Sequence, residues 1–164
     1  AGLAVIQAIL LMIMIVLAFE GPQPELIPWW AGLFVTTFLT LLASTSLGLM
    51  ISSFVKNPTQ ANSALPLILI PQIIFSGILF DIEGPARFIS WIMNSRWSIG
   101  AYAAVPDVNA MVPEALPGVT LPFEGSTTYD ATWENLMLNW AILCVHSLVC
   151  LSVSLWQQKR KDIL

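Results

Sequence analysis

The feature that most constrains this chain is the length of its charge-free stretches. A helix needs about 20 apolar residues to cross the hydrocarbon core of a bilayer. Four stretches, 1–19, 26–55, 57–80 and 135–158, contain no Asp, Glu, Lys or Arg. With 57% hydrophobic and 10% charged residues, a chain of 164 residues has too little polar surface to cover four such helices in water. The sequence therefore predicts an all-α transmembrane fold.

We expect four membrane-spanning helices, over about residues 1–19, 29–54, 61–80 and 135–156. Residues 82–105 are too polar and too interrupted to span, and are expected to form an outer re-entrant or interfacial helical segment.

This segment carries an apolar stripe at helical spacing and a second, polar face. The stripe consists of Phe88, Trp91, Ile92, Ile99 and Tyr102, and the polar face of Arg87, Ser90 and Asn94. Residues 106–134, with four prolines and mixed polarity, are expected to form an extracellular loop with little regular structure.

The basic residues indicate the orientation. Four spans place residues 56–60 and the tail from 159 on the same side, and this side carries Lys56, Lys159, Arg160 and Lys161. The longer loops on the opposite side carry only Arg87 and Arg96. The positive-inside rule therefore predicts a cytoplasmic C-terminus. We expect an integral protein of the plasma or inner membrane, with the lipid bilayer as a partner.

Motifs for enzymatic chemistry are absent from the sequence. It contains no phosphate-binding glycine-rich loop, no nucleophile elbow and no paired Cys or His ligand spacing. We therefore expect no catalytic residue, no metal site, no cofactor bound by this chain and no nucleic-acid partner. Carboxylates at membrane depth, usual in proton- or sodium-driven transporters, are also missing from the predicted spans. This favours an external energy source or a passive role.

Polar side chains inside the predicted spans allow two interpretations. His146 could relay protons, but no charged residue in any span could pair with it. A neutral His146 that donates a hydrogen bond to a neighbouring helix is therefore favoured, and Gln7 and Gln72 are interpreted in the same way. Cys144 and Cys150 lie on different faces of one helix and cannot bridge each other.

The stretch "FSGILFDIEGPARFISWIMNSRWSIGAYAAV", from Phe75, resembles the signature region of the type-2 ABC permease family, the membrane domain of G-subfamily-like (White/PDR-like) exporters. The preceding "GLMISSFVKNPTQANSALPLILIP" is similar to the fourth helix, short inner turn and fifth helix of that family. The matching residues are Phe75, Ser76, Gly77, Ile78 and Leu79, then Trp91, Trp97 and Gly100, and a last helix that reaches Lys161. The resemblance extends over essentially the whole chain.

The resemblance implies that residues 1–164 are the C-terminal four-helix portion of one permease domain. Two further spans and a nucleotide-binding domain, on the same or a separate chain, would then lie outside this sequence. ATP with Mg, and its hydrolysis, are expected on that domain, so this chain would not itself be an enzyme. A homo- or heterodimer of permease domains is also implied.

The resemblance assigns a substrate path as well. In the family, the fifth helix of each protomer faces a central cavity, and a hydrophobic pair after Phe-Ser-Gly forms an outer plug. The path residues would be Pro66, Ile70 and Ile73, and the plug residues Ile78 and Leu79. Positions 66, 70, 73 and 77 share one helical face. That face fits either a cavity or packing on the chain's own helices.

The function that the resemblance implies is the membrane-spanning part of an ATP-driven ABC exporter, moving an amphipathic or lipid-like substrate by alternating access. Two alternatives remain open at this point. One is a passive channel or facilitator that uses the re-entrant segment as a gate. The other is a non-transporting membrane scaffold that presents the outer loop to a partner.

Overall fold

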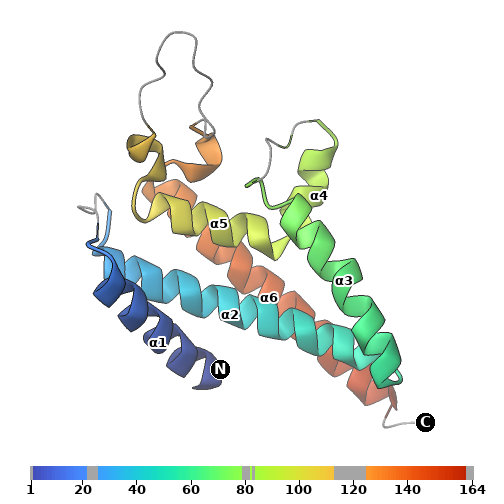
Figure 1. The fold of residues 1–164 in the computed structure, drawn as a ribbon. Helices are drawn as coiled ribbons and strands as arrows, with labels where there is room; N and C mark the ends of the chain where they lie inside the picture. The colour runs from blue at the N-terminus through green and yellow to red at the C-terminus, as the bar shows by residue number, and fades with distance from the viewer. Residues whose placement is uncertain (1, 22–25, 79–81, 83, 113–124, 162–164) are drawn as a thin grey trace.

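The computed structural model describes residues 2–21, 26–78, 82, 84–112 and 125–161. Within these ranges every regular element is helical, as the sequence predicts (Figure 1). The elements are α1 (Gly2–Ala18), α2 (Trp29–Phe54), α3 (Pro58–Ile74), α4 (Ala86–Ile92), α5 (Asn94–Ala104), the short 3₁₀ helices η1 (Val108–Met111) and η2 (Thr127–Tyr129), and α6 (Trp133–Lys161).

Among the described residues, two helices are long and apolar enough to cross a membrane. These are α2, with 26 residues, and the 28 residues of α6 up to Arg160. The other two expected spans also form helices, but α1 and α3 have only 17 residues each. Helix α3 differs from the expected third span at both ends, since it begins at Pro58 rather than near Ala61 and ends at Ile74 rather than near Phe80.

Local sequence explains where α3 begins. The Asn57 side chain accepts a hydrogen bond from the Gln60 amide at 2.8 Å, and the Gln60 side chain accepts one from the Lys56 amide at 2.9 Å. Pro58 follows at the first helical position, where its missing N–H costs no intrahelical bond. The helix then continues through Pro66 and Pro71.

Helices α2 and α6 run side by side in the same direction and form the centre of the molecule with α5 (Figure 1). Trp140 Nε1 donates to Thr36 Oγ1 at 3.0 Å near the start of both helices, and Ser154 Oγ donates to the Leu49 carbonyl at 3.4 Å near their ends. A parallel pair of this kind requires the chain to return between them, and α3 makes that return.

Close packing of α5 depends on Gly100. A Cβ atom at this position would lie 2.7 Å from Asn139 Oδ1 on α6, so only glycine fits without a shift. Around this contact, two small clusters of buried side chains join α5 to its neighbours. One consists of Ala101, Ala104, Val105 and Leu136, and the other of Ala43, Trp97 and Leu143.

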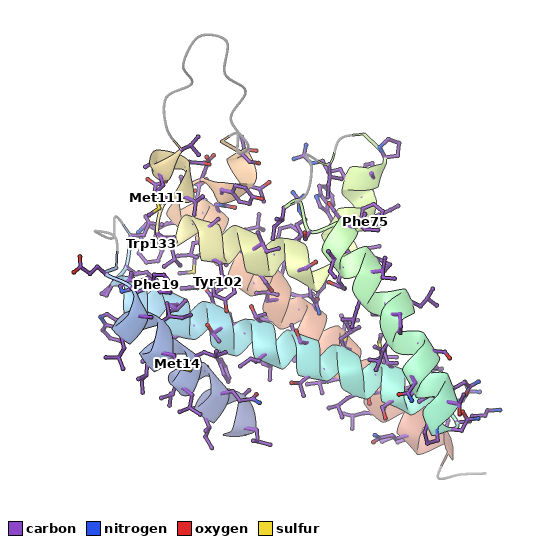
Figure 2. All side chains as sticks on the ribbon, in the orientation of Figure 1. Met14, Phe19, Phe75, Tyr102, Met111 and Trp133 are labelled. Carbon is purple, nitrogen blue, oxygen red and sulfur yellow. The ribbon has the colours of Figure 1, made fainter. Side chains whose placement is uncertain are left out.

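The distribution of polar and apolar side chains is the reverse of that in a water-soluble protein. Buried side chains include many hydroxyl and amide groups, whereas large apolar side chains cover the outside (Figure 2). The buried polar residues are Thr36, Thr37, Ser46, Ser53, Ser76, Ser90, Asn94, Ser98, Asn139, Ser147 and Ser154. Small and weakly polar side chains at helix contacts are typical of membrane helices, because lipid is as apolar as leucine.

Residues 84–105 form a helical hairpin rather than one helix. Met93 has an extended backbone (φ −85°, ψ 124°) that separates α4 from α5. Asn94, at the start of α5, reaches His146 in the middle of α6, and Val105 returns to Gly32 in the first turn of α2. The expected single apolar stripe is therefore divided between two helices. Ser90 and Asn94, from the polar face, are buried, whereas Phe88 and Trp91 are exposed.

The two ends of the molecule differ in composition. The turn between α2 and α3 and the end of α6 lie together, bringing Lys56 and Lys159 to one end, here called the basic end (Figure 1). The hairpin, η1 and η2 lie at the opposite end, here called the loop end. The described parts of the expected outer loop contain only η1, η2 and the start of α6, which begins at Trp133.

Candidate functional site

The predicted path residues lie on an exposed face of α3. Ile70 is 54% and Ile73 60% exposed, and Pro66 is exposed as well. None of the side chains of α3, a helix that the structure describes throughout, is buried. The sequence left two interpretations of this face, a cavity wall or a surface packed on the chain's own helices. Such packing is not found among the described residues. The assignment of these residues to a substrate path stays a prediction.

The Phe-Ser-Gly sequence ends α3 and fixes the backbone beyond it. Ser76 Oγ donates to the Ile73 carbonyl at 2.7 Å and accepts from the Ile78 amide at 3.3 Å. Gly77 has a φ of +86°, which disfavours any residue with a Cβ atom. Phe75 lies at this end of α3, beside α4 (Figure 2).

The predicted plug residues directly follow this turn. Ile78 is 53% exposed, whereas Leu79 lies outside the described residues. The plug role of both residues stays a prediction. Tyr129 of η2 donates from its hydroxyl to the Gly77 carbonyl at 3.0 Å, so the start of the plug is held from a distant part of the chain.

Two polar side chains of the predicted spans bond neighbouring helices, as the sequence favoured. His146 Nδ1 lies 2.7 Å from Asn94 Oδ1, which joins α6 to α5. Gln72 Oε1 accepts from the Ser95 amide at 3.0 Å, and the Ser95 hydroxyl donates to the Gln72 carbonyl. Gln72 therefore attaches the otherwise exposed α3 to the start of α5.

A mainly apolar pocket of about 350 Å³, here called the lateral pocket, lies between α2, α3 and α5. Its polar positions include Thr40, Gln72, Asn94, Ser98 and Tyr102, and the remaining lining is largely aliphatic. A pocket with apolar walls and a few fixed polar groups suits an acyl chain or another small amphipathic ligand.

Hydrogen bonds fix the polar side of the lateral pocket. The Tyr102 hydroxyl donates to Thr37 Oγ1 at 2.8 Å, and Thr40 Oγ1 donates to Ser98 Oγ at 3.1 Å (Figure 2 shows Tyr102 between α2 and α5). Sequence analysis placed Tyr102 in the apolar stripe but selected none of these residues for a site. The spacing of Asn94, Ser98 and Tyr102, four residues apart on one helical face, was the signal that could have identified them.

Comparison with known families identifies the chain. A family model described as ABC-2 type transporter matches residues 2–105, from α1 to the end of α5. The chain belongs to the ABC-2 type transporter family. The resemblance to type-2 ABC permeases is thus confirmed, although this match ends at Val105 and the resemblance was expected over the whole chain.

The chain is also 27% identical, over 173 aligned residues, to the ABC transporter ATP-binding/permease protein Rv1747 of Mycobacterium tuberculosis (strain ATCC 25618 / H37Rv). The alignment covers 97% of this chain and 18% of that relative, so the chain spans less than a fifth of its length. No solved structure matches the chain significantly.

Membership of the family gives the chain a coarse role. An ABC-2 domain is a membrane part of an ABC transporter, which indicates transport rather than enzymatic chemistry. The described residues contain no group of three or more His, Cys, Asp or Glu side chains that could hold a metal ion.

Proposed function

We propose that this chain is the membrane-spanning part of an ATP-driven exporter that moves an amphipathic or lipid-like substrate by alternating access. ATP with Mg would be bound and hydrolysed by an associated nucleotide-binding domain. The name of the relative, which joins ATP-binding and permease functions in one protein, supports this pairing. On this proposal, residues 1–164 form the C-terminal part of one permease domain, and two such domains form a dimer.

The proposed topology has four spans, α1, α2, α3 and α6, with a cytoplasmic C-terminus in the plasma or inner membrane. Its support is the common position of Lys56, Lys159 and Arg160 at the basic end. The loop end would then be extracellular. The helical hairpin of α4 and α5 would be the outer re-entrant segment, because Asn94 reaches the middle of α6.

The observation that carries the proposal is the exposed apolar face of α3. Its apolar side chains, at Pro66, Ile70 and Ile73, are not buried against another helix among the described residues. Ile78 follows shortly after the end of this helix. In a dimer, two such faces would line an uncharged cavity. Walls of this kind favour apolar or weakly polar cargo, because a charged group would lose its hydration there. Ile78 and Leu79 would close the outer end.

Cysteine cross-linking tests the position of this face. In the intact transporter with its native cysteines replaced, Ile73→Cys should form a cross-linked dimer with a short bis-maleimide. Trapping the ATP-bound state should change the yield, because the cavity would narrow. Leu148→Cys is the matched control, since Leu148 is 64% exposed on a different helix, α6. Equal yields from the two variants would contradict the proposal.

A transport assay tests the plug and the energy source. In proteoliposomes, the probe is phosphatidylcholine with a nitrobenzoxadiazole label, whose movement is followed by dithionite quenching. The Ile78→Ala, Leu79→Ala double variant should alter ATP-dependent movement and leave ATP binding intact. Unchanged movement would remove the plug assignment. Movement by the unmodified protein without ATP would instead favour the passive facilitator.

A further inference from the structure

A polar pocket of about 300 Å³ lies at the loop end, between the end of α3, the α4–α5 hairpin and η2. Two arginines, Arg87 and Arg96, line it, and so do the hydroxyl-bearing residues Ser126, Thr127 and Thr128 of η2 and the residue before it. Among the described residues that form this pocket, here called the arginine pocket, there is no Asp or Glu. It is separate from the exposed face of α3.

Arg96 is a half-buried cation that forms no ion pair with an acidic side chain among the described residues. Its Nη1 donates to Ser90 Oγ at 3.1 Å, and its guanidinium lies 5.5 Å from the centre of the Trp97 ring. Its Nε is shielded from solvent and has no hydrogen-bond partner among the described residues. Burial and, secondarily, the nearby Arg87 lower the pKa of Arg96, and the opposite effect of Tyr129 is smaller than either.

One buried side chain contacts both arginines, Arg96 through its guanidinium and Arg87 through its backbone carbonyl. Ser90 is fully buried, and its hydroxyl donates to the Arg87 carbonyl at 2.7 Å while accepting from Arg96. Both arginines line the same pocket, and their like charges repel each other unless an anion lies between or beside them. This arrangement points to a ligand that supplies negative charge.

The opposite wall of the pocket offers further hydrogen-bond donors. Ser126 Oγ accepts from the Thr128 amide at 3.3 Å, and the hydroxyl hydrogens of Ser126, Thr127 and Thr128 have no acceptor within the described chain. The nearby Asp130 is already engaged, because its Oδ1 accepts from Asn109 Nδ2 at 2.8 Å. Two guanidinium groups and three hydroxyl groups exceed what a two-oxygen carboxylate needs, whereas a phosphate group presents more acceptors.

We propose that the arginine pocket binds a phosphate group, carried either by a lipid headgroup or by free inorganic phosphate. Arg87 and Arg96 would each donate to the phosphate oxygens, and the hydroxyls of η2 would donate from the other side. This binding does not depend on the proposed export function and requires no ATP.

Binding measurements on the intact protein in a neutral detergent test the site without any transport step. Inorganic phosphate is titrated by calorimetry, and phosphatidic acid is compared with phosphatidylcholine by native mass spectrometry. Arg87→Gln should weaken phosphate binding at least about tenfold, because it removes a charged hydrogen-bond donor. Arg160→Gln is the matched control, since it removes the same charge at the basic end and should leave affinity within about twofold.

The outcomes separate the sources of the phosphate and can overturn the site. Tighter binding of phosphatidic acid than of inorganic phosphate identifies a lipid headgroup, and equal affinities identify free phosphate. The proposal would be overturned if Arg87→Gln and Arg160→Gln weakened phosphate binding equally, or if neither probe bound. Binding that appears only after Asp81→Asn and Glu83→Gln would also overturn it, because the arginines would then serve the chain's own acids.

Discussion

Helices α6 and α3 are both rich in apolar residues, but they are packed in opposite ways. Along α6, Leu136, Asn139, Leu143 and Ser147 are all buried, and they form one continuous stripe against α2 and α5. No side chain of α3 is buried anywhere along that fully described helix. The apolar content of a membrane helix thus does not say whether it packs within its own chain.

What distinguishes the two helices is the placement of small and polar side chains. On α6, Asn139 contacts Gly100, and His146 bonds Asn94, so both partners can come close. On α3, Gln72 alone makes comparable bonds to another helix in the part of the chain that the structure describes. In lipid, where burial of apolar surface gives no preference for helix contacts, these small and polar groups decide which faces meet.

The largest expected difference comes from truncating one apolar side chain on each helix. Leu143→Ala should lower the free energy of unfolding by about 3 kcal/mol, because it leaves a cavity at a fully buried site. Ile73→Ala, at a site 60% exposed, should change it by less than about 0.5 kcal/mol. Thermal unfolding in detergent measures both. A similar loss of unfolding free energy in both variants would show that the exposed face of α3 is packed against other protein surface in the detergent-solubilised protein.

An intermediate effect is expected where α5 approaches α6. Gly100→Val should destabilise the protein by about 2 kcal/mol, since its side chain would displace Asn139 from its hydrogen bonds to Asn135. Gly48→Ala is the control, because a Cβ atom there meets no atom within 4 Å. A melting temperature for Gly100→Val close to that of Gly48→Ala would mean that the contact is looser than described.

The smallest expected effect concerns the polar bond between α5 and α6. A double-mutant cycle with His146→Ala and Asn94→Ala should give a coupling energy of about 1 kcal/mol, in the range found for membrane hydrogen bonds. Chemical unfolding of the four proteins measures it. Cys144→Ala, at an exposed site on the same helix, should show no coupling to Asn94→Ala. A coupling energy near zero between His146 and Asn94 would mean that their bond does not stabilise the fold and that His146 has another role.

The sequence predicted an all-helical fold because charge-free length is a local property, and two of the four expected spans are helices long enough to cross a membrane within the described residues. It also predicted that His146 and Gln72 would bond neighbouring helices, since an amide or imidazole in lipid needs a partner. The end of α3 was missed. The apolar run continues to Phe80, but the helix ends at Ile74 because the Ser76 hydroxyl and the positive φ of Gly77 form a turn there.

The pockets depend on contacts that no single stretch of sequence contains. The lateral pocket requires α2, α3 and α5 to converge, with Tyr102 bonded to Thr37 across 65 positions of the chain. The arginine pocket forms because Ser126 and its neighbours, which lie far from Arg96 in the sequence, line the same pocket as Arg96 in the fold. The sequence analysis counted Arg87 and Arg96 for orientation and placed Arg87 on a polar face, but it did not pair them, because their proximity depends on the break at Met93.

The slight attachment of α3 has a consequence for movement. Because no side chain of this helix is buried, moving it away from α5 would open no hydrophobic core among the described residues. The resistance would come chiefly from the Gln72–Ser95 bonds and the Tyr129–Gly77 bond, each contributing about 1 kcal/mol. The turn capped by Asn57 would stay in place as the pivot. In this fold α3 can therefore change position at a lower energetic cost than α6, whose inner stripe is buried.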